Sequence, residues 1–280
     1  MKFKKLFHIF KILLIVFWGG FLAIYMLISG YFYLMQRAIL FEGSTLTQPQ
    51  RKEISELYPA ANEILLKLPD GIHLHGWLIR GPEDKNPLVI YFGGNNDEVS
   101  WVLNYKKYFQ GWSLLLLNYR GYGISEGTPS EKDFYRDAAY LYDTFSQSKD
   151  INSDKIIAMG RSMGTGVAVN LTANRDLAGT ILISPYDSMV SVAKSEYPFL
   201  PAGLILKHQF NSIKKAPDIT SPVQMFIAEN DRLIPPELSR KLYNKWGGEK
   251  YFKTIPGENH SSISDNKILW QQVRQFLSEI

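Results

Sequence analysis

The chain has 280 residues, 45% of them hydrophobic, which is enough for one sizeable domain with an appendage and excludes global disorder. It contains no cysteine, which excludes disulfides, a thiolate nucleophile and zinc–cysteine sites. Four lysines among residues 1–35 account for the net charge of +4, so the remainder is neutral and gives no electrostatic reason to expect a nucleic-acid partner.

Residues 12–35 carry no charge and predict a transmembrane anchor helix. Such a helix would span roughly 36 Å, enough to cross a hydrocarbon layer of about 30 Å with some tilt. The lysines before it outnumber Arg37 after it, which predicts residues 1–11 in the cytoplasm and the body on the extracytoplasmic, periplasmic or lumenal, side. A cleavable signal peptide is the alternative, but the stretch is long for one and lacks a good cleavage site, so we expect an uncleaved anchor.

Polar residues 36–62 predict an irregular linker into a domain at 63–280. The domain begins with two strand-like runs around Pro69-Asp70-Gly71, a hairpin signal. Further apolar runs alternate with helical stretches, and they lie at 87–94, 112–121, 155–160, 179–184, 222–230 and 250–257. This alternation indicates an α/β fold with a mostly parallel central sheet and helices on both faces.

One stretch, 187–217, breaks the alternation between two predicted strands. We interpret it as a short lid insertion over the carboxyl edge of the sheet, where open α/β sheets bind their ligands.

Gly160-Arg161-Ser162-Met163-Gly164 is a G-x-S-x-G sequence between a predicted strand and a predicted helix, the context required of a nucleophile elbow. The serine of such an elbow sits in a strained turn, and the flanking glycines avoid clashes with the adjacent strand and helix. The alternative is a glycine-rich phosphate-binding turn, but the lysine of a Walker loop is missing.

A serine nucleophile requires a base, and the chain has five histidines. They are His8, His73, His75, His208 and His260. His260 follows the last predicted strand and is the best base, because it completes the chain order Ser…Asp…His. His73 and His75 share one strand face, a spacing that suits a metal, but a partly exposed hairpin is the preferred interpretation, and we expect neither metal nor cofactor.

The acid that orients the base should follow the penultimate strand, where Asp231 opens a loop. Glu229 and Glu258 are reserve candidates, and a turn or helix cap is the alternative role for Asp231. The oxyanion requires two donors, for which we predict the backbone N–H groups of Met163 and Asn95.

At these motifs the sequence resembles the α/β-hydrolase fold serine hydrolases, and within them the Bem46-like group that includes the ABHD13-type hydrolases. The similar stretches are "NYRGYGISEGTPSE" (118–131), "GRSMGTGVAV" (160–169), "SPYDSMVSVAKSEYPFLP" (184–201), "AENDRLIPPELSRKLY" (228–243) and "IPGENHSS" (255–262). The resemblance covers roughly residues 60–280, and an N-terminal membrane anchor is common in the group. The group usually has His-Gly-Asn where this chain has Gly93-Gly94-Asn95, so the oxyanion loop lacks its usual imidazole.

The sequence therefore predicts a membrane-anchored serine hydrolase of the esterase, lipase or thioesterase kind, cleaving ester or thioester bonds of small acyl or lipid-like substrates. Residues expected to line its substrate pocket are Gly93, Gly94, Tyr186, Tyr197, Phe199 and Leu200. An aminopeptidase or amidase would use the same Ser-His-Asp triad, and the sequence does not separate the two. A non-catalytic, membrane-tethered scaffold is the third alternative.

Overall fold

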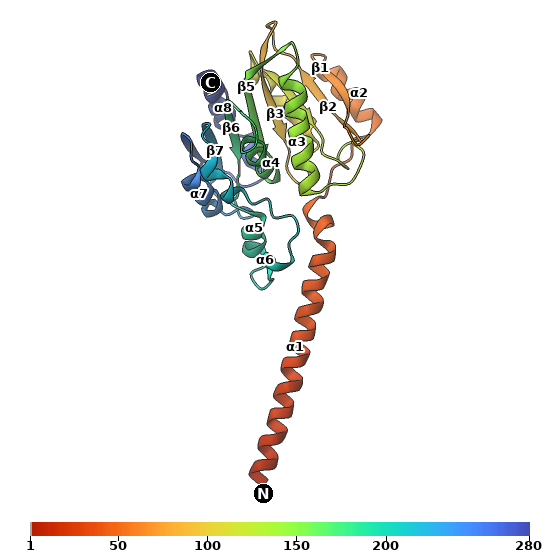
Figure 1. Ribbon diagram of the computed structural model, residues 1–280, viewed down its shortest axis with the longest axis vertical. Coiled ribbons are helices and arrows are strands. Elements are labelled where there is room, and N and C mark those ends of the chain that lie inside the picture. The colour runs from red at the N-terminus through yellow and green to blue at the C-terminus, as the bar shows by residue number, and fades with distance from the viewer. Residues whose placement is uncertain (1) are drawn as a thin grey trace.

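The structure, a computed structural model that describes residues 2–280, is built around an eight-stranded sheet (Figure 1). The strands are β1 (Ala61–Lys67), β2 (His73–Ile79), β3 (Asn86–Phe92), β4 (Ser113–Leu117), β5 (Ile151–Arg161), β6 (Gly179–Ile183), β7 (Val223–Ala228) and β8 (Lys250–Ile255). Their order across the sheet is β1-β2-β4-β3-β5-β6-β7-β8. β2 pairs antiparallel with β1 and β4, and all other pairs are parallel, which confirms the predicted class.

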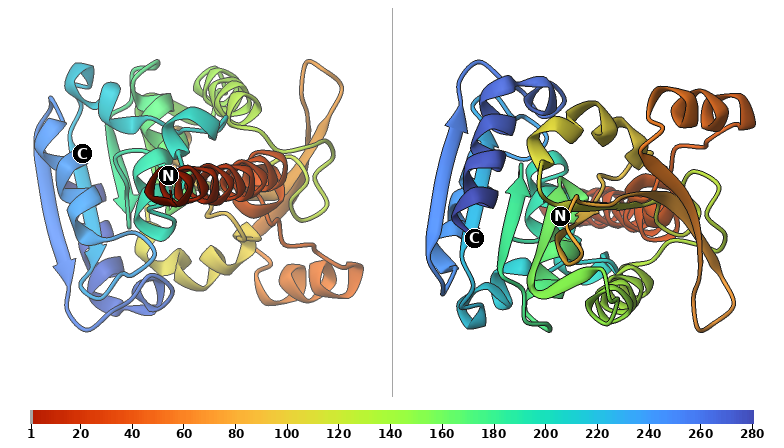
Figure 2. Two further views of the ribbon diagram at one scale, coloured as in Figure 1. Left: turned by 90° about the horizontal axis from the view of Figure 1, so that it is seen from below. Right: turned by 90° about the horizontal axis from the view of Figure 1, so that it is seen from above.

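Helices cover both faces of this sheet (Figure 2). The α-helices are α1 (Lys2–Leu40), α2 (Gln48–Leu57), α3 (Glu131–Ser146), α4 (Met163–Thr172), α5 (Met189–Glu196), α6 (Ala202–Ile205), α7 (Pro236–Lys245) and α8 (Lys267–Glu279), and the 3₁₀ helices are η1 (Val99–Phe109), η2 (Ser212–Lys214), η3 (Ala216–Asp218) and η4 (Ser262–Asp265). Residues of α3, α4 and α7 pack on one face of the sheet, whereas η1 and α8 pack on the other.

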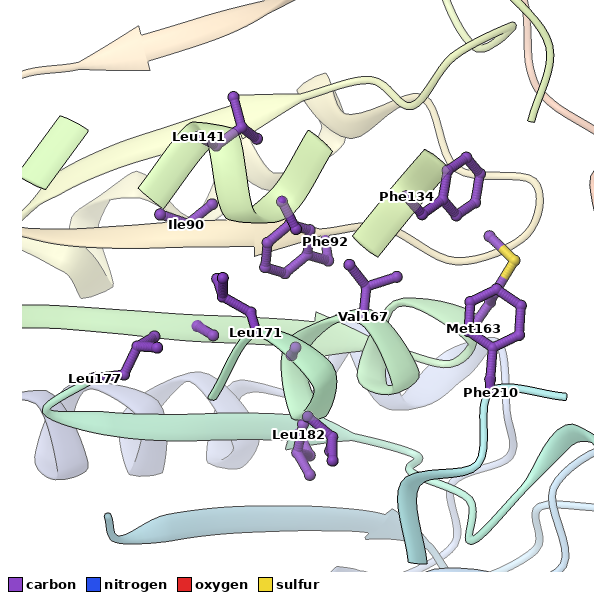
Figure 3. Close-up of a cluster of buried hydrophobic side chains, with 14 of the residues drawn as sticks. Ile90, Phe92, Phe134, Leu141, Met163, Val167, Leu171, Leu177, Leu182 and Phe210 are labelled. Atoms are coloured by element: carbon purple, nitrogen blue, oxygen red, sulfur yellow. The ribbon is translucent and has the colours of Figure 1, made fainter. Parts of the chain in front are cut away.

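Strand β3 shows how one apolar run serves both faces. Because side chains alternate along a strand, Ile90 and Phe92 join α3 and α4 (Figure 3), while Val89 and Tyr91 join η1 and α8. All four side chains are almost completely buried. The sheet is thus a layer between two apolar cores, and its carboxyl edge is the rim on which loops from β3, β5, β7 and β8 meet.

Helix α1 projects from the domain as a long, isolated rod (Figure 1). Among residues 2–280, it is the one helix long and apolar enough to cross a membrane. Most of its large apolar side chains are exposed, which is unlike a core helix of a soluble domain.

The prediction that residues 36–62 form an irregular linker is wrong. Helix α1 continues to Leu40, and a second helix, α2, precedes β1. Thr47 and Gln50 form a capping box, with the Thr47 N–H and Oγ1 both donating to Gln50 Oε1, and Pro49 lies in the first turn. These local start signals outweigh the polar composition from which a linker was predicted.

The stretch 187–217 leaves the sheet after β6 and contains the short helices α5 and α6. Figure 1 shows both beside the domain end of α1. The Glu131 carboxylate, at the start of α3, accepts hydrogen bonds from the backbone N–H groups of Gln209 (2.7 Å) and Phe210 (2.9 Å) and so fixes the returning part of this segment. We refer to 187–217 as the lid segment.

Candidate active site

Ser162 lies in a strained turn between the end of β5 and the start of α4. Its φ of 49° and ψ of −121° place it in a region that non-glycine residues rarely adopt. The neighbouring glycines are required by space: a Cβ on Gly164 would lie 2.1 Å from the Phe92 carbonyl oxygen, and one on Gly160 would lie 2.5 Å from the Gly164 oxygen. The sequence therefore forms a sharp elbow that holds the serine at the rim.

Three side chains predicted from separate loops meet at this elbow. His260 Nε2 is 2.9 Å from Ser162 Oγ, and His260 Nδ1 is 2.8 Å from Asp231 Oδ2. Because a carboxylate only accepts hydrogen bonds, Nδ1 must carry the proton, which leaves Nε2 free to accept from the serine hydroxyl. Asp231 and Ser162 are buried, and 14% of the His260 side chain is exposed, so the pair is shielded while the base remains accessible.

Asp231 is fixed by its own loop after β7. Its Oδ1 accepts hydrogen bonds from the backbone N–H groups of Ile234 (2.8 Å) and Leu233 (3.1 Å), which leaves Oδ2 for the imidazole. The reserve candidates lie elsewhere: the Glu229 carboxylate accepts from Gly257 N–H at 2.8 Å, and Glu258 binds two side chains of the His260 loop. Hydrogen bonds from Ser262 and Asn266 lower the pKa of Glu258. Both glutamates thus shape the loop that presents His260 and do not contact its ring.

The two predicted oxyanion donors border the same hollow as Ser162. Met163 is the first residue of α4, so its N–H has no intrahelical acceptor and lies at the positive end of the helix dipole. Asn95 lies across the hollow in the loop after β3. The backbone oxygen of Asn95 accepts hydrogen bonds from Tyr122 Oη (2.8 Å) and Gly43 N–H (3.3 Å), which hold the peptide group that joins Asn95 to Asn96.

The loop is therefore held without the imidazole that its sequence lacks. Tyr119 Oη donates to the Gly93 carbonyl oxygen at 3.1 Å, and Asp97 Oδ2 accepts from the Gly94 N–H at 2.7 Å. A residue shortly after α1 also takes part, because Ser44 Oγ donates hydrogen bonds to Asn96. The hydroxyls of Tyr119 and Tyr122 thus brace this loop.

Arg161, the residue before the serine, joins the loops around the site. Its Nη1 donates to Asp97 Oδ1 (3.1 Å), its Nε to Ser264 Oγ (2.9 Å) and its Nη2 to the His260 carbonyl oxygen (3.2 Å). One guanidinium thus links the loop after β3 to the loop that carries His260. Sequence reasoning missed this role, since nothing in a G-x-S-x-G motif specifies where the intervening side chain points.

Comparisons with known proteins agree with this geometry. The family model described as "Serine aminopeptidase, S33" matches residues 83–207. An uncharacterized protein of Mycobacterium tuberculosis is 30% identical over 230 residues, which cover 80% of this chain and 82% of that protein. Protein bem46 of Schizosaccharomyces pombe is 25% identical over 276 residues, or 92% of this chain and 91% of that protein. The chain belongs to the Bem46-like group of α/β hydrolases.

Other proteins similar to this chain include a lipase and an esterase. The lysophosphatidylserine lipase ABHD12 of Danio rerio is 32% identical over 190 residues, which cover 60% of this chain and 49% of the lipase. An α/β hydrolase from Vibrio vulnificus has a TM-score of 0.67 at 21% identity, covering 84% of this chain and 88% of that one. An esterase from Pyrococcus furiosus has a TM-score of 0.64 at 18% identity, covering 84% and 95%, and both likenesses show the shared fold.

A mostly apolar cavity of about 200 Å³ opens beside Ser162 of the hydrolase. It is lined by Phe32, Gln36, Ile39, Leu40, Asn95, Ser162, Met163, Tyr186, Met189, Val192, Ala193, Glu196, Tyr197, Leu200, Ala202, Ile205, Leu206, Leu233 and Ile234. Of the predicted pocket residues, it brings together Tyr186, Tyr197 and Leu200.

The other predicted pocket residues lie outside this wall. Gly93 and Gly94 are turned toward Asp97, which a Cβ on either residue would approach to 3.0–3.2 Å. Phe199 is 55% exposed at the tip of the lid segment. Sequence reasoning missed the wall that α1 supplies, although Gln36, a polar residue directly after the apolar stretch, was a signal that this end of the helix meets protein.

The remaining histidines of the hydrolase are away from Ser162. His75 is buried, contrary to the expectation of a partly exposed pair, because Glu63 on β1 binds its Nε2 at 2.7 Å and Asn118 lies 3.4 Å from its Nδ1. Burial lowers the pKa of His75, and Glu63 opposes that shift only in part. His73 pairs with Glu126, and within residues 2–280 no three His, Asp or Glu side chains are grouped to hold a metal ion.

Proposed function

We propose that this protein is a membrane-anchored serine hydrolase that cleaves carboxylic ester or thioester bonds of acyl, lipid-like substrates. The observation that carries the proposal is the continuous chain of hydrogen bonds from Ser162 through His260 to Asp231. Two observations support it: the apolar cavity that borders the serine, which we call the acyl cavity, and the lipase and esterase among the similar proteins.

The proposed reaction begins when Ser162 Oγ attacks the substrate carbonyl carbon while His260 Nε2 takes the hydroxyl proton. Asp231 holds the ring and stabilises its charged form. The N–H groups of Met163 and Asn95 stabilise the negative oxygen of the tetrahedral intermediate. The imidazolium then protonates the leaving alcohol or thiol, and a water activated by His260 releases the acyl group and restores the serine.

A fluorophosphonate probe tests the nucleophile directly. We expect the wild-type chain to be labelled and the Ser162→Ala variant to remain unlabelled, with its rate on p-nitrophenyl butyrate reduced by roughly 10⁴-fold or more. Ser184→Ala is the matched control, because Ser184 follows the neighbouring strand β6 and has a similar φ of 48°. Failure of a folded wild-type sample to react would favour the scaffold alternative.

A serine aminopeptidase is the second candidate, favoured by the description of the matched family model. An aminopeptidase needs a carboxylate for the substrate's amino group, whereas the carboxylate among the described cavity residues, Glu196, is exposed. We therefore favour esters. Rates on p-nitrophenyl esters of rising chain length, measured beside aminoacyl-p-nitroanilides, separate the two activities, and faster anilide cleavage would reverse our preference.

We further infer that α1 is a single-pass anchor with a cytoplasmic N-terminus. The basic residues Lys4, Lys5 and Lys11 precede its apolar part, and the catalytic domain follows on the extracytoplasmic side. Protease added to intact and to permeabilised cells tests this topology. If the domain resists protease in intact cells and in spheroplasts, and is digested only after the cytoplasmic membrane is permeabilised, the domain lies in the cytoplasm instead.

A further inference from the structure

One face of α1 is buried at its domain end, whereas most of the large apolar side chains elsewhere on the helix are exposed. Ser29 and Gln36 are 8% and 6% exposed, and Phe32 and Leu40 are half-buried. These positions recur every three or four residues, which places them on one side of the helix. Leu34, on another side of the same turns, is 77% exposed. The domain end of α1 therefore has a side that belongs to the protein.

That side contacts the lid segment. Gln36 Oε1 accepts from the Lys207 N–H at 2.7 Å, and Gln36 Nε2 donates to the Ile205 carbonyl oxygen at 3.2 Å. The rings of Phe32 and Tyr197 are 4.9 Å apart. Figure 1 shows α5 and α6 alongside this part of α1, so the contacts are not confined to the point where the helix joins the domain.

The same two turns of α1 also border the acyl cavity. Phe32, Gln36 and Ile39 form part of its wall, and Ser162 lies in the wall as well. The cavity is smaller than the ~300–1,000 Å³ typical of sites for drug-sized ligands, which suits one hydrocarbon chain. The nucleophile and the membrane helix are thus on the boundary of a single apolar space.

We propose that the acyl chain of a membrane amphiphile enters this cavity sideways from the lipid leaflet, and that the last two turns of α1 determine which chains are accepted. The inference rests on the proposed function and assigns it a substrate source. A path through water would expose the chain to solvent. Each exposed methylene would lower the equilibrium population of the chain in water about fourfold relative to apolar surroundings. A path along α1 keeps the chain in apolar surroundings throughout.

The tip of the lid segment fits this route. Leu204 is 88% exposed and Phe199 is 55% exposed, both close in sequence to residues that contact α1. These two large apolar side chains are exposed close to α1, whose own exposed apolar surface continues away from the domain. The lipid surface that surrounds α1 is the partner of matching chemistry for them, and the cavity mouth then faces the leaflet.

The test uses the full chain in phosphatidylcholine vesicles and the ratio of rates on p-nitrophenyl palmitate and p-nitrophenyl acetate. Ile39→Trp places an indole in the cavity wall, and we expect the ratio to fall at least tenfold. Leu34→Trp is the matched control in the same turns and should keep the wild-type ratio. An unchanged ratio in Ile39→Trp, with the thermal unfolding midpoint preserved, would overturn the inference.

The source of the substrate is tested by varying vesicle lipid at a fixed total amount of palmitate ester. If the chain enters from the leaflet, the rate follows the mole fraction of ester in the bilayer, and dilution with more lipid lowers it. A rate that follows the bulk concentration would contradict lateral entry. Fluorophosphonate labelling of the same samples keeps the outcomes separate: loss of labelling in the wild type would refute the hydrolase itself, whereas intact labelling confines a failure to the entry route.

Discussion

Different forces stabilise two neighbouring regions of the molecule: the rim that carries Ser162, and the acyl cavity beside it. At the rim, directional hydrogen bonds fix each group, and the Arg161 guanidinium links loops that lie far apart in the sequence. In the cavity, apolar side chains from α1 and the lid segment meet, with Gln36 as the polar contact between them. Hydrogen bonds set geometry to a fraction of an ångström, whereas apolar contacts select by shape and tolerate repacking. Under the proposed function, chemistry and substrate choice therefore depend on separable parts of the molecule.

The largest effect should come from the acid at the rim. Asp231→Asn replaces a carboxylate by an amide that can donate to His260 Nδ1, which then favours the wrong tautomer. We expect kcat to fall by about 10⁴-fold on short and long esters alike. Steady-state kinetics on the acetate and palmitate esters checks this, and a loss restricted to one chain length would contradict the separation of the two regions.

A smaller effect is expected from Arg161→Met, which removes the links to Asp97, Ser264 and the His260 backbone. Loosening two loops by a fraction of an ångström should lower kcat by roughly 10–100-fold, with little change in KM for the acetate ester. Arg161→Lys keeps the charge but not the fork and should recover part of the loss. In a double-mutant cycle with Asp97→Asn the effects should not add, and full additivity would show that the ion pair has no role.

The smallest effect concerns a network outside both regions. Burial lowers the pKa of His75 in the folded protein. The His75 imidazole therefore takes up a proton near pH 6.5 in the unfolded chain but only at a lower pH in the folded chain. The free energy of unfolding should therefore fall as the pH drops below about 6.5. His75→Gln should flatten this slope, and His73→Gln, on the same strand at the surface, should not. Thermal unfolding in detergent between pH 7.5 and 5 measures both, and identical slopes for His75→Gln and the wild type would count against the assignment.

The rim could be predicted from sequence because its parts are local and strict. Gly160 and Gly164 are required by backbone contacts, and a serine, an acid and a histidine follow in order after three strands. Hydrogen bonds join Ser162, His260 and Asp231 in the structure. The fold class was also predictable from local sequence, because each continuous apolar run indicates a buried strand.

The cavity wall was less predictable because its residues are brought together by packing between distant segments. Tyr186, Tyr197 and Leu200 were anticipated from the lid segment, but Phe199 points outward, and the contribution of α1 was overlooked. An apolar helix has the same composition whether it faces lipid or substrate, so its sequence does not mark the side that meets the domain. Arg161 was missed because a long side chain reaches partners that no spacing rule specifies.

The segment that leaves α1 also has a consequence for how the enzyme can be produced. Gly43 donates to Asn95, and Ser44 contacts Asn96, so the residues just beyond the helix brace the loop on which the proposed oxyanion donor sits. A fragment that begins at β1 would retain all three members of the proposed triad yet lose this brace and the part of the cavity wall that α1 supplies. The substrate selectivity of such a fragment would therefore differ from that of the full-length protein.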